Sequence, residues 1–237
     1  EERIAERIDA NLMDITMDDM KSLPKQIYDK KLETATQGCT GKLIVKEYPT
    51  ATAHANHFRA LLDELKLKKK FIPDIIFIDY LNICASSRMK QNANVNSYTY
   101  IKAIAEELRG LAVERNVPVF SATQTNRSGF NNSDVGLEDT SESFGLPATA
   151  DLMFALISTE ELEEANQMMI KQLKNRYNDV ITNKKFVVGI NRAKMKLFDV
   201  DPHEQTGLVD TNLSEDTEYG NGFGEDSFKQ KFAGWNV

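Results

Sequence analysis

Asp74–Ile83 reads DIIFIDYLNI, and this stretch decides the fold of the chain. Its apolar run holds a single internal acid, Asp79, and a run buried on both faces is typical of a central parallel strand. Val117–Gln124 (VPVFSATQ) predicts the next strand, and Tyr98–Asn116 predicts a helix between the two. The succession of strand, helix and strand indicates an α/β fold with a mainly parallel central sheet.

Periodicity extends this prediction in both directions. The N-terminal part predicts helices, a second group of strands predicts an antiparallel C-terminal edge, and the polar stretch 125–141 predicts a long loop. The expected helices span 1–13, 17–20, 21–37 and 54–67. Pro24 lies near the start of the third, and the fourth is closed by Lys66, Lys68, Lys69 and Lys70. The further expected strands span 42–48, 151–158, 168–176, 186–191 and 196–200.

Composition places the chain among soluble globular proteins. Of the 237 residues, 41% are hydrophobic and 27% charged, which is enough to bury a core and excludes collagen-like and wholly disordered classes. Two cysteines make no disulfide framework, and no apolar run is long enough to cross a bilayer. We therefore expect a cytoplasmic protein without a membrane partner.

The net charge of −7 is concentrated at one end of the chain. From Asp199 to Ser227 the chain carries nine acids and no Lys or Arg, and Lys229 and Lys231 follow. The preceding part is neutral, so an acidic chain does not exclude a nucleic-acid partner. We expect one domain over 1–200 and an acidic, glycine-containing, flexible tail over 201–237. The chain opens without Met inside an amphipathic pattern, which predicts a piece of a longer protein.

Functional groups of parallel sheets gather at the carboxyl ends of the strands, and this rule selects three places: Asp79-Tyr80, Thr123-Gln124 and the segment after the long polar loop. Asp79 ends the first strand as in a Walker B motif, where the carboxylate holds nucleotide-bound Mg²⁺; alternatively it is a paired core acid. Gln124 ends the second strand. Its carboxamide can donate to a phosphate oxygen and accept from a water, or it can simply satisfy nearby backbone groups.

Lys174 and Arg176 form a third candidate. Strand residues two apart point to one face, so the two cations can reach one anion together. One interpretation is an arginine finger that stabilises charge on a transferring phosphoryl group. The other is a solvated sheet edge.

The motifs resemble one family. DIIFIDYLNI, VPVFSATQTNR, TSESFGLPATADLMFAL and IKQLKNR follow one another in the order and spacing of the C-terminal, RecA-like ATPase domain of DnaB-type hexameric replicative helicases, above all of the T4-like bacteriophage branch. The resemblance covers about 1–200. It implies a P-loop NTPase core, ATP and Mg²⁺ as cofactors, and single-stranded DNA as the strand along which the protein translocates.

The resemblance also assigns roles residue by residue. Asp79 matches the Walker B acid, Gln124 the glutamine that reads the γ-phosphate, and Lys174 with Arg176 the pair that reaches the neighbouring subunit's nucleotide. The channel loop that holds single-stranded DNA matches Ser141, Glu142, Ser143, Phe144 and Gly145. Ser141 stands where the family has a basic residue, so Arg88, Lys90 and Arg127 are the nearest substitutes for contacts with phosphates.

Two parts of the family pattern are missing. No G-x-x-x-x-G-K-[ST] loop occurs, and the catalytic glutamate that follows it falls before Glu1. We therefore expect a RecA-like core without its first strand and P-loop, which does not bind or hydrolyse ATP unaided.

Three functions remain open. The leading interpretation is an ATP-driven motor that forms a homo-hexameric ring, translocates on single-stranded DNA, unwinds the replication fork, and meets a primase and a helicase loader. A recombinase-like ATPase of the same fold is the second. The third is a non-catalytic assembly module.

Overall fold

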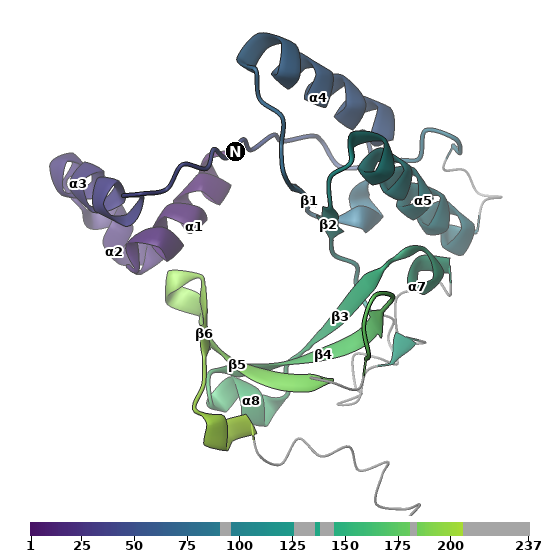
Figure 1. Ribbon diagram of the computed structural model, residues 1–237. Helices are drawn as coiled ribbons and strands as arrows, with labels where there is room; N and C mark the ends of the chain where they lie inside the picture. Colours follow the sequence, from purple (N-terminus) through teal and green to yellow (C-terminus); the bar gives the residue numbers. More distant parts are fainter. Residues whose placement is uncertain (91–95, 126–135, 138–144, 181–183, 206–237) are drawn as a thin grey trace, which may run out of the picture. The chain divides into compact units, whose positions relative to one another are not determined.

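The computed structural model describes residues 1–90, 96–125, 136–137, 145–180 and 184–205 (Figure 1). The chain divides into two units, Glu1–Asp199 and Val200–Val237. Within the described part of the second unit lies a single short 3₁₀ helix, η4 (Pro202–Gln205). All other elements below belong to the first unit. None of the described helices has the length and apolar character that crossing a bilayer requires.

The predicted parallel strands are present as a pair. β1 (Ile76–Ile78) runs parallel to β2 (Val119–Ser121), and helix α5 (Ser97–Arg115) lies between them in the sequence. The register pairs Ile78 with Ser121, so the two strands end side by side. Both strands are shorter than the runs that predicted them.

α5 carries the main core. Ile104 and Leu111 are almost completely buried, and α5 packs against the short 3₁₀ helix η1 (Leu81–Ile83) after β1 and against α7 (Gly145–Thr149). Ile78 and Phe58 pack against the same cluster. The buried members of this cluster are Leu81, Cys84, Tyr100, Ile101, Ile104, Ala105, Leu108 and Leu146.

The expectation that the first strand is buried on both faces is wrong for the described residues. Ile78 faces the α5 core, but Phe77 is 69% exposed and stacks on its register partner Phe120, with ring centroids 5.4 Å apart. Successive strand residues point to opposite faces, and the described helices that pack on this pair do so from the Ile78 side. The apolar run therefore supplies one buried face and one exposed face.

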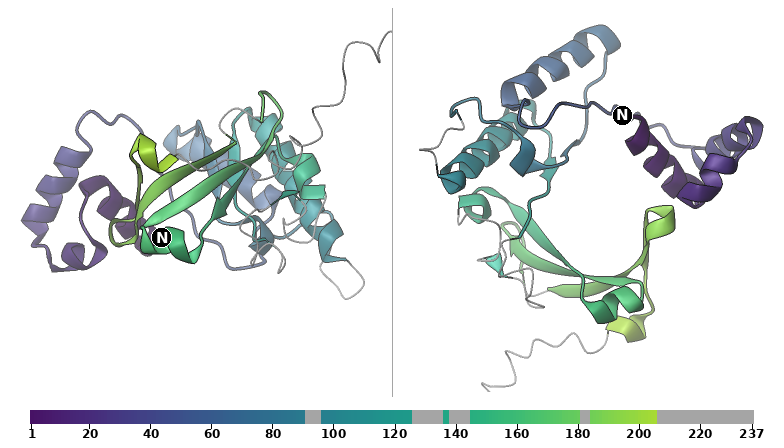
Figure 2. Two further views of the ribbon diagram at one scale, coloured as in Figure 1. Left: turned by 90° about the horizontal axis from the view of Figure 1, so that it is seen from below. Right: turned by 180° about the vertical axis from the view of Figure 1, so that it is seen from behind.

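The second group of strands forms the predicted antiparallel sheet, which Figure 2 shows from two further sides. The strands lie in sequence order: β3 (Leu152–Ile157), β4 (Gln167–Asn175), β5 (Lys185–Asn191) and β6 (Lys196–Asp199). The short helix α8 (Glu160–Glu164) joins the first two, and η3 (Arg192–Lys194) joins the last two. Gly189 pairs with Phe198, and a Cβ at that glycine would lie 2.3 Å from the phenyl ring, so a larger residue there would require the ring to move.

Three helices open the chain: α1 (Glu2–Met13), α2 (Met17–Ser22) and α3 (Lys25–Ala35). Thr16 caps α2, because its hydroxyl accepts the backbone N–H of Asp19 at 3.0 Å. The single helix expected over 21–37 is wrong at its start. Pro24 disfavours a helical conformation for Leu23, which is extended, so Lys21 and Ser22 end α2 instead.

α4 (Ala55–Lys69) matches the helix expected over 54–67. Of the lysines predicted to close it, Lys66, Lys68 and Lys69 lie in its last turn and Lys70 is its C-cap. The strand expected over 42–48 is wrong. These residues are extended without ladder pairing to any described strand, and Leu43 is 65% exposed. A β-branched apolar run becomes a strand only where a neighbouring strand supplies hydrogen bonds.

The burial of α5 leads to a stability prediction. Replacing Leu111, which is 0% exposed, by Ala should lower the free energy of unfolding by about 2–5 kcal/mol, because transfer and cavity terms add. Val113→Ala on the same helix is the control, since Val113 is 73% exposed and should cost under about 1 kcal/mol. Denaturant titration monitored by circular dichroism measures both, and equal losses would contradict the assignment of the core.

Candidate functional site

Asp79 and Gln124 lie at the same edge of the parallel pair, after the carboxyl ends of β1 and β2. Asp79 directly follows β1, and the Ser121 hydroxyl at the end of β2 donates to the Ile78 carbonyl at 2.8 Å. Beyond the strands, the Leu81 N–H donates to the Ala122 carbonyl at 3.2 Å, so the two chain segments stay adjacent.

Two side-chain contacts complete this link. The Gln124 carboxamide donates through Nε2 to the Tyr80 hydroxyl at 3.3 Å, and the Thr123 hydroxyl donates to Asn82 Oδ1 at 2.9 Å. Gln124 thus contacts the residue that follows Asp79 in the chain. The geometry matches what the strand-end rule predicts: an acid and a carboxamide at one edge of a parallel pair.

The Asp79 side chain is a carboxylate, which is a type of ligand that Mg²⁺ binds. It is exposed, and its carboxylate makes no ion pair within the described residues. No group of three or more His, Cys, Asp or Glu side chains gathers around a common point in the described part. Mg²⁺ keeps most of its waters and is often bound through one or two carboxylates together with substrate phosphates, so a lone strand-end acid fits this ion.

Lys174 and Arg176 contact a different part of the chain. The Lys174 ammonium donates to the Pro147 carbonyl, and the Arg176 guanidinium donates to the Ala148 carbonyl at 3.3 Å and to Asp151 Oδ1 at 2.7 Å. The two cations share one face at the end of β4, as their spacing predicts. Their contacts are with α7 and the residues after it rather than with Asp79 or Gln124.

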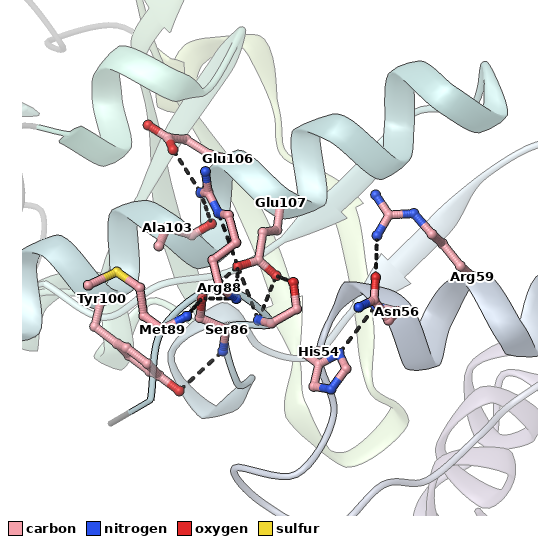
Figure 3. Close-up of polar contacts among 11 residues, drawn as sticks. His54, Asn56, Arg59, Ser86, Arg88, Met89, Tyr100, Ala103, Glu106 and Glu107 are labelled. Carbon is pink, nitrogen blue, oxygen red and sulfur yellow. Dashed lines mark hydrogen bonds and ion pairs between the residues drawn. The ribbon is translucent and has the colours of Figure 1, made fainter. Parts of the chain in front are cut away.

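The loop after η1 is held to α5 by one carboxylate. Glu107, whose side chain is 8% exposed, accepts the Ser86 hydroxyl at 2.5 Å, the Ser87 hydroxyl at 2.6 Å and the Ser87 backbone N–H at 2.8 Å (Figure 3). The Tyr100 hydroxyl accepts the Ser86 N–H at 3.1 Å. The segment that follows Asp79 and η1 is therefore fixed on the helix that carries the core.

Arg88 completes this cluster from the loop side (Figure 3). Its guanidinium donates to Glu106 at 2.8 Å, to the Ala103 carbonyl at 3.0 Å and to Glu107 at 3.4 Å. The hydrogen bond to Glu106 is the largest influence that raises the pKa of Arg88. Burial raises the pKa of Glu107, but its hydrogen bonds from Ser86, Ser87 and Arg88 outweigh burial, and the net pKa is lowered.

The predicted DNA contacts fall in three groups. Arg88 already has protein partners, whereas Lys90 nearby is exposed. Gly145 is buried at the start of α7, where a Cβ would lie 2.7 Å from Cδ of Lys102 on α5. The remaining candidates lie outside the described residues: Arg127, Ser141, Glu142, Ser143 and Phe144. Their role in binding DNA stays a prediction.

Sequence reasoning assigned no role of their own to four side chains that organise these contacts, although the strand-end rule selected the position of Tyr80. Tyr80 receives Gln124, Glu107 anchors the loop, and Arg109 and Asp151 join α5 to the segment after α7. Tyr80 follows Asp79 directly, so its position was available as a signal. Glu107 and Arg109 are typical polar positions of an amphipathic helix, and Asp151 is a typical polar start of a strand.

A model of one protein family matches most of the chain. Residues 1–196 match the DnaB-like helicase C-terminal domain, so the chain belongs to this family. Its fold class, an α/β core of the RecA type with parallel and antiparallel strands, is that expected from the sequence.

Curated relatives agree with this assignment. Over 204 residues the chain is 48% identical to the DnaB-like replicative helicase of Enterobacteria phage T4, covering 85% of the chain and 43% of that protein. Over 160 residues it is 30% identical to the replicative DNA helicase DnaB of Helicobacter pylori, covering 65% of the chain and 31% of that protein. The chain thus spans less than half the length of these relatives.

Solved structures share the fold at low identity. One solved ATPase domain superposes with a TM-score of 0.64 and 20% identity, covering 82% of this chain and 69% of that one. A DnaB-like replicative helicase, described with its primase interactions, gives a TM-score of 0.64 and 19% identity, covering 83% of this chain and 47% of that one.

The Glu107 anchor predicts a pH-dependent stability difference. Because the pKa of Glu107 is lowered from its ordinary 4.5, the carboxylate stabilises the fold above that pH and loses this effect as pH falls through the folded-state value. Glu107→Gln should cost about 1–3 kcal/mol at pH 7, because it removes the charged acceptor. The gap between variant and wild type should narrow below pH 4.5.

The matched control is Glu106→Gln. Glu106 also pairs with Arg88 but is 41% exposed, so its loss should cost under about 1 kcal/mol. Urea titrations at pH 7 and in the acid range provide the measurement. A Glu107→Gln deficit that stays constant with pH would show that the carboxylate charge is not the source of the stabilisation.

Proposed function

We propose that this chain is the motor domain of an ATP-driven replicative DNA helicase, which translocates on single-stranded DNA and unwinds duplex DNA at the replication fork. The observation that carries the proposal is the pairing of β1 with β2 in a chain of the DnaB-like family, with Asp79 directly after β1 and Gln124 hydrogen-bonded to the next residue, Tyr80. The 48% identity to a phage replicative helicase supports it.

In this proposal the strand ends serve the nucleotide. Asp79 holds the Mg²⁺ of bound ATP, directly or through water, and the ion neutralises charge that develops on the phosphates. Gln124 distinguishes the triphosphate from the diphosphate, since its carboxamide can donate to a phosphate oxygen and accept from a water. Its hydrogen bond to the Tyr80 hydroxyl joins Gln124 to the residue that follows the acid.

Lys174 and Arg176 act on the nucleotide of a neighbouring subunit. Their contacts with α7 and Asp151, rather than with Asp79, support a role outside their own nucleotide site. A planar guanidinium binds phosphate oxygens in a bidentate manner and stabilises transition-state charge. Such a site exists only between subunits, which is consistent with a homo-hexameric ring.

The remaining partners follow from the same function. Single-stranded DNA contacts the channel loop, whose last residue is Gly145, and phosphates contact Lys90 and Arg127, with Arg88 a further candidate. A primase and a helicase loader are the protein partners, and one solved relative is described with its primase interactions. Unwinding of DNA at the replication fork takes place in the cytoplasm of the host cell.

A mixing experiment in the complete protein tests this proposal. Asp79→Asn should abolish most ATP hydrolysis because the magnesium ion loses a charged ligand, and Arg176→Ala should do the same through the neighbour. An arginine finger contributes roughly 10³–10⁵ in rate, so mixed rings that join an intact metal site to an intact finger should regain measurable hydrolysis. ATPase activity with single-stranded DNA is followed against the mixing ratio.

Arg192→Ala serves as the control, because Arg192 is an exposed arginine of η3 that pairs with Glu163. This variant should keep its activity alone and in mixtures. A flat titration of the two inactive variants, with subunit exchange confirmed by labelled subunits, would refute the action of Arg176 between subunits. Near-wild-type turnover of Asp79→Asn would refute the metal role.

A further inference from the structure

Three cations hold the end of α7. The carbonyls of Pro147, Ala148 and Thr149 accept hydrogen bonds from Lys174, Arg176 and Arg109, in that order. The last carbonyls of a helix lack partners within the helix, and basic side chains commonly satisfy them. The end of α7 is therefore fixed from two directions, by Arg109 on α5 and by the pair on β4.

Asp151 joins two of these cations. Its Oδ1 accepts from Arg109 Nη1 at 2.9 Å and from Arg176 Nη1 at 2.7 Å, and its carbonyl accepts the Arg176 backbone N–H at 2.9 Å. The Asp151 side chain is 33% exposed, so solvent screens these pairs only in part. Without this carboxylate, Arg109, Arg176 and Lys174 would repel one another around a five-residue helix.

Two anions can therefore compete for Arg176: the Asp151 carboxylate and a phosphate. Its Nη1 is occupied by Asp151 and its Nη2 by the Ala148 carbonyl, and a guanidinium fits a carboxylate and a phosphate with the same fork. When Arg176 engages a phosphate, some of these bonds must lengthen or break. The end of α7 then loses one of its three cations.

A displacement of the C-terminal end of α7 is transmitted along the helix to its first residue. Gly145 opens the helix, packs against Lys102 of α5, and is the last of the five residues expected to contact DNA. Leu146 is buried in the α5 core. The helix therefore has little free space at its first turn, and a shift at Ala148 is passed on along a single helical segment.

We propose that Asp151 is a positioning residue that holds Arg176 on α7. Through this contact it couples nucleotide binding at one subunit interface to DNA binding at Gly145, the first residue of α7. The inference rests on the proposed helicase function and deepens it. Asp151 touches neither nucleotide nor DNA. It sets the position of Arg176. When a phosphate binds Arg176, the resulting shift reaches Gly145 through α7.

The test compares Asp151→Asn, Asp151→Glu and wild type in the complete protein. The readout is the ratio of the Kd for a fluorescent oligo-dT without nucleotide to the Kd with a non-hydrolysable ATP analogue. Coupling between sites in proteins commonly changes affinity by about 5–150-fold, and we expect wild type to lie in this range. Asp151→Asn keeps the shape but not the charge, so its ratio should fall close to 1.

Two further measurements separate coupling from folding. For ATP hydrolysis with DNA, Asp151→Asn should lower kcat about tenfold with little change in KM, because the lost interaction serves the transition state rather than ATP binding. Asp151→Glu keeps the carboxylate and should recover part of the ratio and of kcat. Glu163→Gln, which removes an exposed carboxylate partner of Arg192, should match wild type in all assays.

Each outcome decides the inference. An Asp151→Asn ratio equal to that of a coupled wild type would overturn the role of Asp151 and leave the helicase function intact. Equal loss in Asp151→Asn and Asp151→Glu, with a lower unfolding midpoint for both, would make Asp151 merely structural and also overturn it.

A wild type without ATP hydrolysis on DNA would overturn the proposed function and this inference together. If Asp151→Asn does not fold, the ratio for Asp151→Glu decides: a value below wild type supports the coupling, and an unchanged value overturns it.

Discussion

The burial of one face of α5 is the constraint on which the described structure depends. Ile104 and Leu111 are almost inaccessible to solvent, and β1, η1 and α7 all pack against this helix. Burying a side chain such as Leu111 is worth roughly 1.5–3 kcal/mol relative to leaving it exposed. That apolar contact places the ends of β1 and the start of α7 against one rigid element, and the polar groups of the helix then act at fixed positions.

Those polar groups extend from α5 to three separate segments. Glu107 accepts hydrogen bonds from the loop after η1, Arg109 reaches the end of α7 and Asp151, and Arg115 pairs with Asp63 of α4 at 2.6 Å. Only Glu107 is nearly buried among these described groups, so its hydrogen bonds count most for stability, while the more exposed ion pairs contribute less. One helix thus fixes both the segment after Asp79 and the segment that Lys174 and Arg176 contact.

Sequence patterns found most of the elements, and their errors have physical causes. α1, α4 and α5 follow from the spacing of apolar residues, a pattern that acts within a few positions of the chain. The strand expected over 42–48 fails because pairing depends on a neighbouring strand, which local pattern does not reveal. The exposure of Phe77 has the same origin, since hydrophobicity does not say which faces of a strand are covered.

For the candidate site, the sequence by itself determined the types of chemistry: an acid and a carboxamide at two strand ends, and a Lys-x-Arg pair on a later strand. The tertiary structure alone decided which groups meet, because hydrogen bonds and ion pairs join residues far apart in the chain. Gln124 meets Tyr80 across 44 positions, and Arg109 meets Asp151 across 42. No local pattern records such a pairing; it exists only once β1 and β2 align and α5 buries its apolar face.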